Sequence, residues 1–120
     1  MGIELEGVDE LLRKLGELED QGQRAANSAL REAGNVIQVS IQAEAPVRTG
    51  TLRKSIQRSG IRTQDGVKHV LVYPGAFYGR MIELGTVKMR ANPFMARGYE
   101  SSKQQAVDVI ADELRKGLGL

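Results

Sequence analysis

The chain has 120 residues, a formal net charge of +2 with 27% charged residues, and no cysteine, so its length suits one domain, residues 1–120, with a hydrophobic core of its own. The lack of cysteine excludes disulfide and thiolate chemistry and fits a protein of the cytosol, and the single histidine, His69, argues against a histidine-based metal site or triad. No apolar run approaches the roughly 20 residues of a membrane span, and the acidic start is unlike a signal peptide, so we expect a soluble, unsecreted protein with no cofactor, metal or membrane partner.

The charges are distributed unevenly along this nearly neutral chain. Residues 1–20 hold seven acidic and two basic side chains, a net charge of −5. Residues 45–63 hold five basic and no acidic side chains, a net charge of +5. These five are Arg48, Arg53, Lys54, Arg58 and Arg62.

The first third of the chain is predicted to be mainly helical. Residues Gly2–Glu6 alternate apolar and acidic side chains like an edge strand, and Asp9 can cap a helix that ends by Gly22. A longer helix is predicted from about Arg24 to Glu44, because its apolar residues follow a 4-3-4-4 spacing. These residues are Ala26, Leu30, Ala33, Ile37 and Ile41. The alanines of this helix would let another element approach closely, either in the core or in a neighbouring subunit.

The stretch Ala45–Ile56 marks the change from helix to sheet. Pro46 should close the long helix, because the residue before a proline avoids the α conformation. Thr49 or Thr51 can then cap a short helical turn. The apolar side chains of Leu52 and Ile56 should point inward and anchor this turn to the core.

Residues 57–73 have the pattern of a β-hairpin around Asp65-Gly66, a pair that favours a type I′ turn. With a two-residue loop, Ile61 lies opposite Val70 and Ser59 lies opposite Val72. The first strand is polar and basic and the second is apolar, as expected of an edge strand beside a more central one. On this register Ile61, Val70 and Val72 share one face, whereas Arg58, Arg62, His69, Leu71 and Tyr73 share the other.

The chain then returns to helix. Pro74-Gly75 ends the sheet, and Phe77–Leu84 fits a short helix that Gly85 stops. Its inward side chains are expected to be Tyr78, Met81 and Ile82. Residues 86–92 alternate apolar and basic side chains and predict a strand or an extended arm.

A closing helix is predicted after this segment, with Asn92 as its cap and Pro93 at its first position. Its buried face should hold Tyr99, Ala106, Ile110 and Leu114. The order of elements predicts an α+β domain, in which a small antiparallel sheet packs against the long helix and the C-terminal helix. The sheet would consist of the hairpin around Asp65-Gly66 plus one or two further strands.

No catalytic site can be assembled from these residues. A nucleophile with a base and an orienting group is absent, and so is an isolated carboxylate pair. Glu83 lies between two apolar residues, but a pairing with Arg80 or Lys88 explains it better than a role as general base. We therefore expect that the protein is not an enzyme.

Three segments together carry a family resemblance. They are Ala45–Ile56 (Ala-Pro-Val-Arg-Thr-Gly-Thr-Leu-Arg-Lys-Ser-Ile), Tyr78–Thr86 (Tyr-Gly-Arg-Met-Ile-Glu-Leu-Gly-Thr) and Asn92–Arg97 (Asn-Pro-Phe-Met-Ala-Arg). In this order and spacing the chain resembles the small neck, tail-completion or head–tail joining proteins of lambdoid-type long-tailed bacteriophages, a minor tail component family. The resemblance covers most of the chain and brings no catalytic residue with it.

The resemblance implies a structural virion protein that assembles in the host cytoplasm as a homo-oligomeric ring at the head–tail junction. Its partners would be other copies of itself, the phage head-completion or connector proteins, and a tail terminator or tail tube protein. A tail terminator that caps the tail tube is the alternative role, and a DNA-binding protein without sequence specificity is a more distant one. Genomic DNA would pass through the lumen of the ring without specific binding.

The same resemblance suggests which side chains meet neighbours, since a closed ring needs unlike surfaces on identical subunits. The candidates for a subunit or partner interface are Arg48, Arg53, Lys54, Val87, Lys88, Met89 and Arg90. Arg58 and Arg62 are candidates to face a channel. Residues 86–92 fit two interpretations, a projecting arm that contacts a neighbour and an internal strand of the same subunit.

Overall fold

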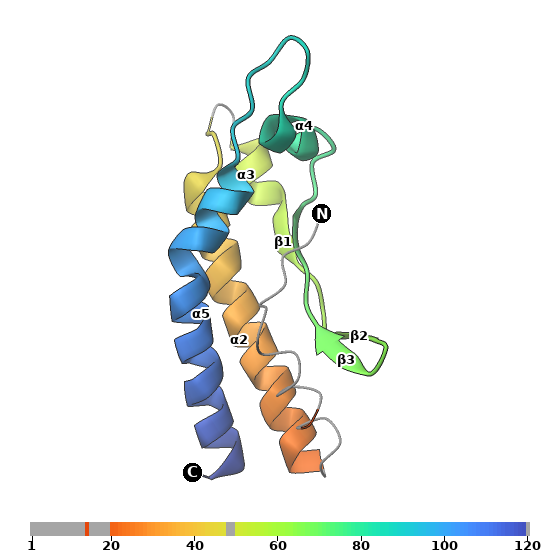
Figure 1. Cartoon of the computed structure of the whole chain (residues 1–120), viewed down its shortest axis with the longest axis vertical. Coiled ribbons are helices and arrows are strands. Elements are labelled where there is room, and N and C mark those ends of the chain that lie inside the picture. The colour runs from red at the N-terminus through yellow and green to blue at the C-terminus, as the bar shows by residue number, and fades with distance from the viewer. Residues whose placement is uncertain (1–13, 15–19, 48–49, 120) are drawn as a thin grey trace.

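The structure is a computed structural model that describes residue 14 and residues 20–47 and 50–119. The predicted strand at residues 2–6 and nearly all of the predicted helix that follows Asp9 lie outside the described residues. So do Arg48 and Thr49. The fold is α+β, as predicted, and its elements lie along an elongated body (Figure 1).

Two long helices form the body of the molecule. Helix α2 spans Asp20–Glu44 and helix α5 spans Phe94–Leu118, and they run antiparallel along the long axis (Figure 1). Helix α2 ends before Pro46, as predicted. It begins earlier than expected, at Asp20, and Gly22 lies buried inside its first turns. The end of the predicted preceding helix lies outside the described residues. Gln21 at this end donates a hydrogen bond to the carbonyl oxygen of Gly117, so contact with α5 continues to the first turn of α2.

The small residues of α2 and α5 allow the two helices to approach closely. A Cβ atom added to Gly98 would lie 2.6 Å from the Cα of Ile41, and one added to Gly117 would lie 2.6 Å from the Cβ of Ala25. Four alanines of α2 are almost completely buried, namely Ala25, Ala26, Ala29 and Ala33. These alanines therefore belong to the chain's own core.

A short helix turns the chain after α2. Helix α3 spans Thr51–Ser55, and its cap is Gly50 at φ 80°, a left-handed conformation that glycine adopts without strain. Gly50 holds the cap position and Thr51 is the first residue of the helix, so the predicted role of Thr51 as the cap is wrong. The alternative cap, Thr49, lies outside the described residues. Leu52 and Ile56 are buried, as predicted.

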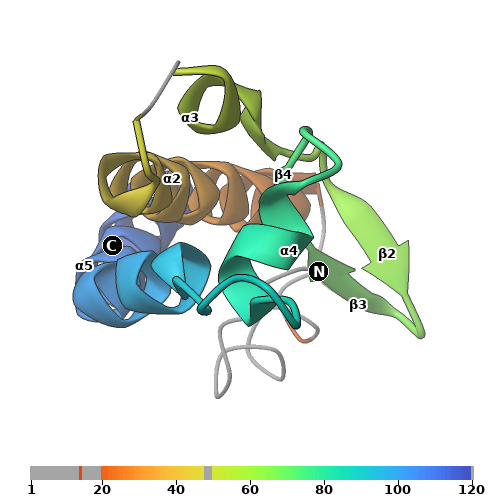
Figure 2. The ribbon, with the colours of Figure 1, turned by 90° about the horizontal axis from the view of Figure 1, so that it is seen from above.

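The strands form two antiparallel ladders. Strand β1 (Ile56–Arg58) pairs with β4 (Val72–Pro74), and β2 (Arg62–Gln64) pairs with β3 (Val67–His69). The predicted turn joins β2 to β3, with Asp65 at φ 53° and Gly66 at φ 77°, the two positive values that a type I′ turn requires. Arg62 lies opposite His69, as expected. The β2–β3 hairpin extends sideways from the helix pair (Figure 2).

The register changes by one residue between the two ladders. Arg58 lies opposite Val72, so the predicted pairing of Ser59 with Val72 is wrong. Ser59 pairs with Leu71 instead: its amide donates to the Leu71 carbonyl at 2.8 Å, and its Oγ accepts from the Leu71 amide at 2.9 Å. Gly60 and Ile61 then stand opposite the single residue Val70, which is a bulge in the first strand.

The bulge places Arg58 against the long helix. Shifting a strand by one residue moves its side chains to the opposite face. The Nε of Arg58 donates to the Oδ1 of Asn35 at 2.7 Å, and its Cδ would be 2.7 Å from a Cβ added to Gly34. Arg58 therefore does not share the face of Arg62, contrary to the predicted register.

Candidate assembly surface

One end of the molecule carries helix α4 and a projecting loop (Figure 1). Helix α4 spans Gly79–Leu84 and stops at Gly85, as predicted. Thr86 and Met89 exchange backbone hydrogen bonds of 2.9 and 3.2 Å, so Val87 and Lys88 form the tip of a tight turn. The predicted continuous alternation over residues 86–92 is therefore interrupted, and this segment is a tight-turned loop.

The base of this loop is held closed by backbone contacts and a buried carboxylate. The amide of Asn92 donates to the Ile82 carbonyl at 2.8 Å. Glu83 is 7% exposed, and its two oxygens accept hydrogen bonds from the amides of Met95 and Ala96 at 2.9 and 3.2 Å. These amides have no partner within a helix at its first turn, and a negative charge there also complements the helix dipole.

Glu83 thus acts as the cap of α5 from a different helix. The predictions that Asn92 caps this helix and that Glu83 pairs with Arg80 or Lys88 are both wrong. The Oδ1 of Asn92 instead accepts a hydrogen bond from Arg97 at 2.7 Å. Local sequence patterns could not identify this cap, because the carboxylate approaches from the far side of the loop.

Exposed apolar side chains gather at this end of the molecule. Among the described residues, five of the eight exposed large apolar side chains lie between residues 77 and 89. We call these five the end patch; its members are Phe77, Met81, Leu84, Val87 and Met89. Phe77 is 84% exposed and Leu84 is 60% exposed, and Met81 is exposed instead of pointing inward as predicted. Concentrated apolar exposure of this kind marks a surface that another molecule covers.

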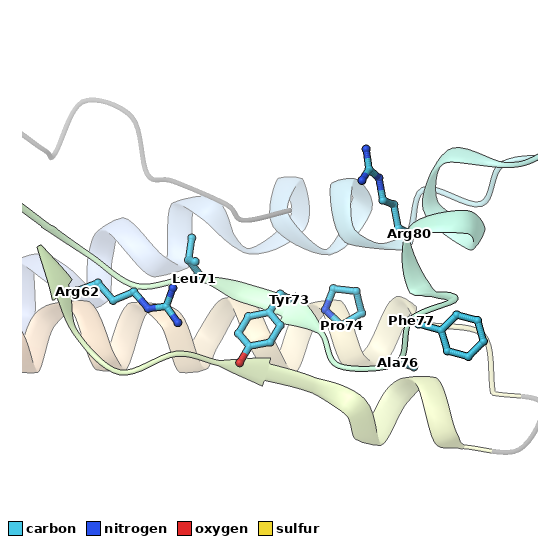
Figure 3. Close-up of a pocket in the computed structure, with 7 residues that line it drawn as sticks. All are labelled: Arg62, Leu71, Tyr73, Pro74, Ala76, Phe77 and Arg80. Carbon is cyan, nitrogen blue, oxygen red and sulfur yellow. The ribbon is translucent and has the colours of Figure 1, made fainter. Parts of the chain in front are cut away.

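A groove lies beside the end patch, along strand β4. It has a volume of about 450 Å³, within the range of clefts that hold ligands. We call it the arginine groove; it is lined by Arg62, Leu71, Tyr73, Pro74, Ala76, Phe77 and Arg80. Figure 3 shows Arg62 at one end of this row and Phe77 and Arg80 at the other, with Leu71, Tyr73 and Pro74 between them.

The sequence-predicted interface residues occupy different environments. Lys54 is exposed on α3, whereas Arg53 is half-buried and its Nε atom is buried without a hydrogen-bond partner. Four residues lie exposed on the loop after α4, namely Val87, Lys88, Met89 and Arg90. Arg48 is outside the described residues. The loop residues and Arg62 are therefore the predicted residues that the structure places beside the end patch and the groove.

Three residues of this surface were not identified from the sequence. Arg80 was considered only as a partner for Glu83, and Phe77 and Leu84 were considered only as helix residues. Nothing in the sequence could have revealed that Arg62 and Arg80 line one groove, because this depends on the course of β4.

The described part of the chain contains neither a cluster of metal-ligating side chains nor a helix that is long and apolar enough to cross a membrane. The cations of the arginine groove also lack side-chain partners there: no hydrogen bond or ion pair of the Arg62 or Arg80 side chain is formed with any described residue. Within the described residues, the arginine groove therefore combines an apolar surface with two arginines that make no side-chain hydrogen bond or ion pair, which suits contact with another macromolecule.

Comparison with known proteins identifies a family to which the sequence of this chain is similar. The family described as "Bacteriophage HK97-gp10, putative tail-component" matches the chain over residues 9–85, which is more than half of its length. The match includes α2, the strands and α4, and it ends at the start of the projecting loop. A search of curated proteins and a search of solved structures gave no match to this chain.

Proposed function

This chain belongs to the HK97-gp10-like family of bacteriophage tail components, and we propose that it is a structural virion protein that forms a closed ring at the head–tail junction. The ring joins the connector to the tail tube. Its partners are other copies of the chain, the head-completion or connector proteins on one side, and the tail terminator or tail tube protein on the other. The role involves no catalytic step.

The observation that carries this proposal is the end patch. Burying a side chain such as Leu, Val, Phe or Met is worth about 1.5–3 kcal/mol relative to leaving it in water. Burial of five such side chains on one short segment would therefore strongly favour association. The closed base of the loop supports the same conclusion, because a loop held in one conformation loses little entropy when it binds.

A ring also needs a second surface that differs from the first. Heterologous contacts between unlike surfaces of identical subunits close into rings when the rotation between neighbours permits it. Lys88 and Arg90 of the projecting loop place positive charge beside the end patch, whereas residues 1–20 carry a net charge of −5. Opposite charges on the two surfaces favour one register and exclude wrong contacts.

DNA that crosses the ring is proposed to do so without specific binding. Contacts with phosphate would be independent of sequence and sensitive to salt. A channel through which DNA slides gains nothing from tight binding. We therefore assign the exposed cations mainly to protein contacts.

The end patch can be tested with the double variant Leu84→Ser/Val87→Asp. Because both side chains are exposed, the variant should keep the circular dichroism spectrum and the melting temperature of the parent chain. It should lose ring formation, measured as mass by native mass spectrometry, and phage that carry it should accumulate unjoined heads and tails. The matched control is Val39→Ser, an exposed valine on α2 outside the end patch, which should assemble normally.

Two outcomes would count against the proposal. Normal joining of heads to tails by the double variant would show that the end patch has no role in assembly. Tails of abnormal length, with heads and tails still joined, would point to the tail terminator role instead.

A further inference from the structure

We propose that the arginine groove of one copy of this chain binds the outer face of helix α5 from a second copy. The inference rests on the proposed ring and names one of its subunit contacts. We call this outer face the α5 stripe; its members are Glu100, Gln104, Val107, Asp108 and Ala111. A helix that lays one face into a groove is a common form of protein recognition.

The arginine groove has an apolar floor between two cations. Val72 of β4 is buried in the core, so its neighbours Leu71 and Tyr73 point to the opposite side, into the groove. An arginine stands at each end of the row, Arg62 and Arg80 (Figure 3). The described lining residues include no carboxylate. An occupant with both apolar and acidic side chains therefore suits this groove.

The α5 stripe presents apolar and acidic side chains on one side of the helix. Four of its members stand at i, i+3, i+4 and i+7, which are positions on one helix face; they are Gln104, Val107, Asp108 and Ala111. The core face of α5 is marked by the buried Ala106. Val107 is 38% exposed. A surface that contacts Val107 therefore reaches the carboxylate of Asp108 as well.

The two acidic residues of the stripe are available to a partner. Asp108 forms no ion pair with any described residue, and its carboxylate accepts a hydrogen bond from the neutral side chain of Gln104 at 3.1 Å. Glu100 pairs with Lys103 at 2.9 Å, and both side chains are more than half exposed. Because such an exposed pair contributes little to stability, Glu100 can exchange Lys103 for a new partner at little cost.

The spacing of the acidic residues fits a groove with separated cations. A helix rises 1.5 Å per residue, so Glu100 and Asp108 lie about 12 Å apart along its axis. The two arginines are separated by the apolar row (Figure 3), and Phe77, which is 84% exposed, lies at the same end as Arg80. We therefore place Val107 on Phe77 and Asp108 at Arg80, with Glu100 towards the other arginine. A guanidinium can donate two parallel hydrogen bonds to one carboxylate.

The groove and the stripe belong to opposite sides of the molecule. Helix α2 lies between α5 and the strands (Figure 1) and packs against both. The groove therefore cannot receive the stripe of its own chain. A subunit in a ring offers one surface to the preceding neighbour and an unlike surface to the next one. The groove and the stripe meet this requirement, so the occupant is assigned to a second copy.

The projecting loop is a poorer occupant of the same groove. It also exposes apolar side chains, Val87 and Met89, but it carries Lys88 and Arg90 beside them. Like charges that face each other across an interface are unfavourable. The loop would therefore repel the two arginines, whereas the stripe attracts them.

Introduced cysteines report this contact, because the native chain contains none. The experiment mixes two full-length chains of different mass, one with Ala76→Cys in the groove and one with Ala111→Cys in the stripe. Under mild oxidation the expected product is a mixed disulfide dimer. In the control, Gln105→Cys replaces Ala111→Cys. Gln105 is exposed on α5 but lies two residues from Val107, on the opposite side of the helix, so no enrichment is expected.

A pair of charge reversals tests the assigned partners. Adding Arg80→Glu to the groove chain should lower the yield of the mixed dimer about tenfold, because two carboxylates would then face each other. Adding Asp108→Lys to the stripe chain should restore the yield. Both side chains are exposed, so each variant should keep the circular dichroism spectrum of the parent chain.

Three results would overturn the inference. They are a mixed-dimer yield no higher than that of the Gln105→Cys control, a yield that Arg80→Glu leaves unchanged, and a reduced yield that Asp108→Lys does not restore. Native mass spectrometry of the parent chain separates the inference from the proposed function. Rings without the cross-link overturn the inference alone, whereas a lack of rings would contradict both.

Discussion

Replacing Gly98 by alanine is expected to destabilise the protein by about 2–3 kcal/mol, although alanine is the better helix former. Alanine in place of glycine inside a helix usually gains about 1 kcal/mol. Here the new Cβ would lie 2.6 Å from the Cα and 2.8 Å from the amide nitrogen of Ile41, well inside the usual contact distance of about 3.5–4 Å between carbon atoms. Because backbone atoms cannot rotate away, α2 and α5 would have to separate along their shared core.

The measurement is the free energy of unfolding from urea titration. The matched control is Gly34→Ala in α2, where the nearest atoms to the new Cβ belong to the flexible side chain of Arg58 and to Val70. Both variants gain the same helix propensity. We expect the control to lose less stability than Gly98→Ala, because the side-chain atoms of Arg58 and Val70 can shift where the backbone atoms of Ile41 cannot. Equal stability of the Gly98→Ala variant and the parent would show that the two helices are not held at this distance.

Replacing Glu83 by alanine is expected to lower the free energy of unfolding by about 3 kcal/mol. Hydrogen bonds to a charged group contribute about 1.5–3 kcal/mol, and a buried amide left without an acceptor adds its own desolvation cost. Glu83→Ala would leave the amides of Met95 and Ala96 without their carboxylate. Glu83→Gln keeps the shape and one acceptor oxygen, so its cost should be smaller, about 1 kcal/mol.

Amide hydrogen exchange gives a local measurement of the same effect. Exchange at Met95 and Ala96 should accelerate in Glu83→Ala, and the first turn of α5 should lose protection before the rest of the helix. The control is Glu100→Ala on the same helix, where the carboxylate makes an exposed ion pair with Lys103. Because an exposed ion pair contributes little to stability, its removal should leave exchange at Met95 and Ala96 unchanged. Unchanged exchange at Met95 in Glu83→Ala would refute the capping role.

The Glu83 cap also links stability to assembly. It connects α4, which carries part of the end patch, to the start of α5 across the projecting loop. Loss of the cap should therefore loosen the loop that presents Val87 and Met89. An assembly defect in Glu83→Ala would follow from this loosening even though Glu83 itself is buried.

Elements set by local chemistry could be predicted from the sequence. Pro46 ends α2, Asp65-Gly66 forms the hairpin turn, and Gly85 ends α4, because each depends on the conformation of one or two residues. The buried face of α2 was also predicted, since helical spacing reports directly which residues share a face. The family, and with it a structural role in the phage tail, was identified from segments distributed along the chain.

Features that depend on distant contacts could not be predicted. The bulge at Gly60 and Ile61 accompanies the packing of Arg58 against α2. Glu83 replaces Asn92 as a cap because α4 folds back onto the start of α5. The candidate site has the same limit. Arg62 was proposed from its charge alone, and its position opposite Arg80 in one groove follows from the path of β4.

Electron cryomicroscopy of the assembled virion tests the proposed function most directly. We predict density for the antiparallel pair α2 and α5, repeated in one closed ring between the connector and the tail tube. The end patch should face a neighbouring copy or an adjoining tail protein. Finding this chain in repeated layers along the tail tube, in the head, or nowhere in the particle would contradict the account.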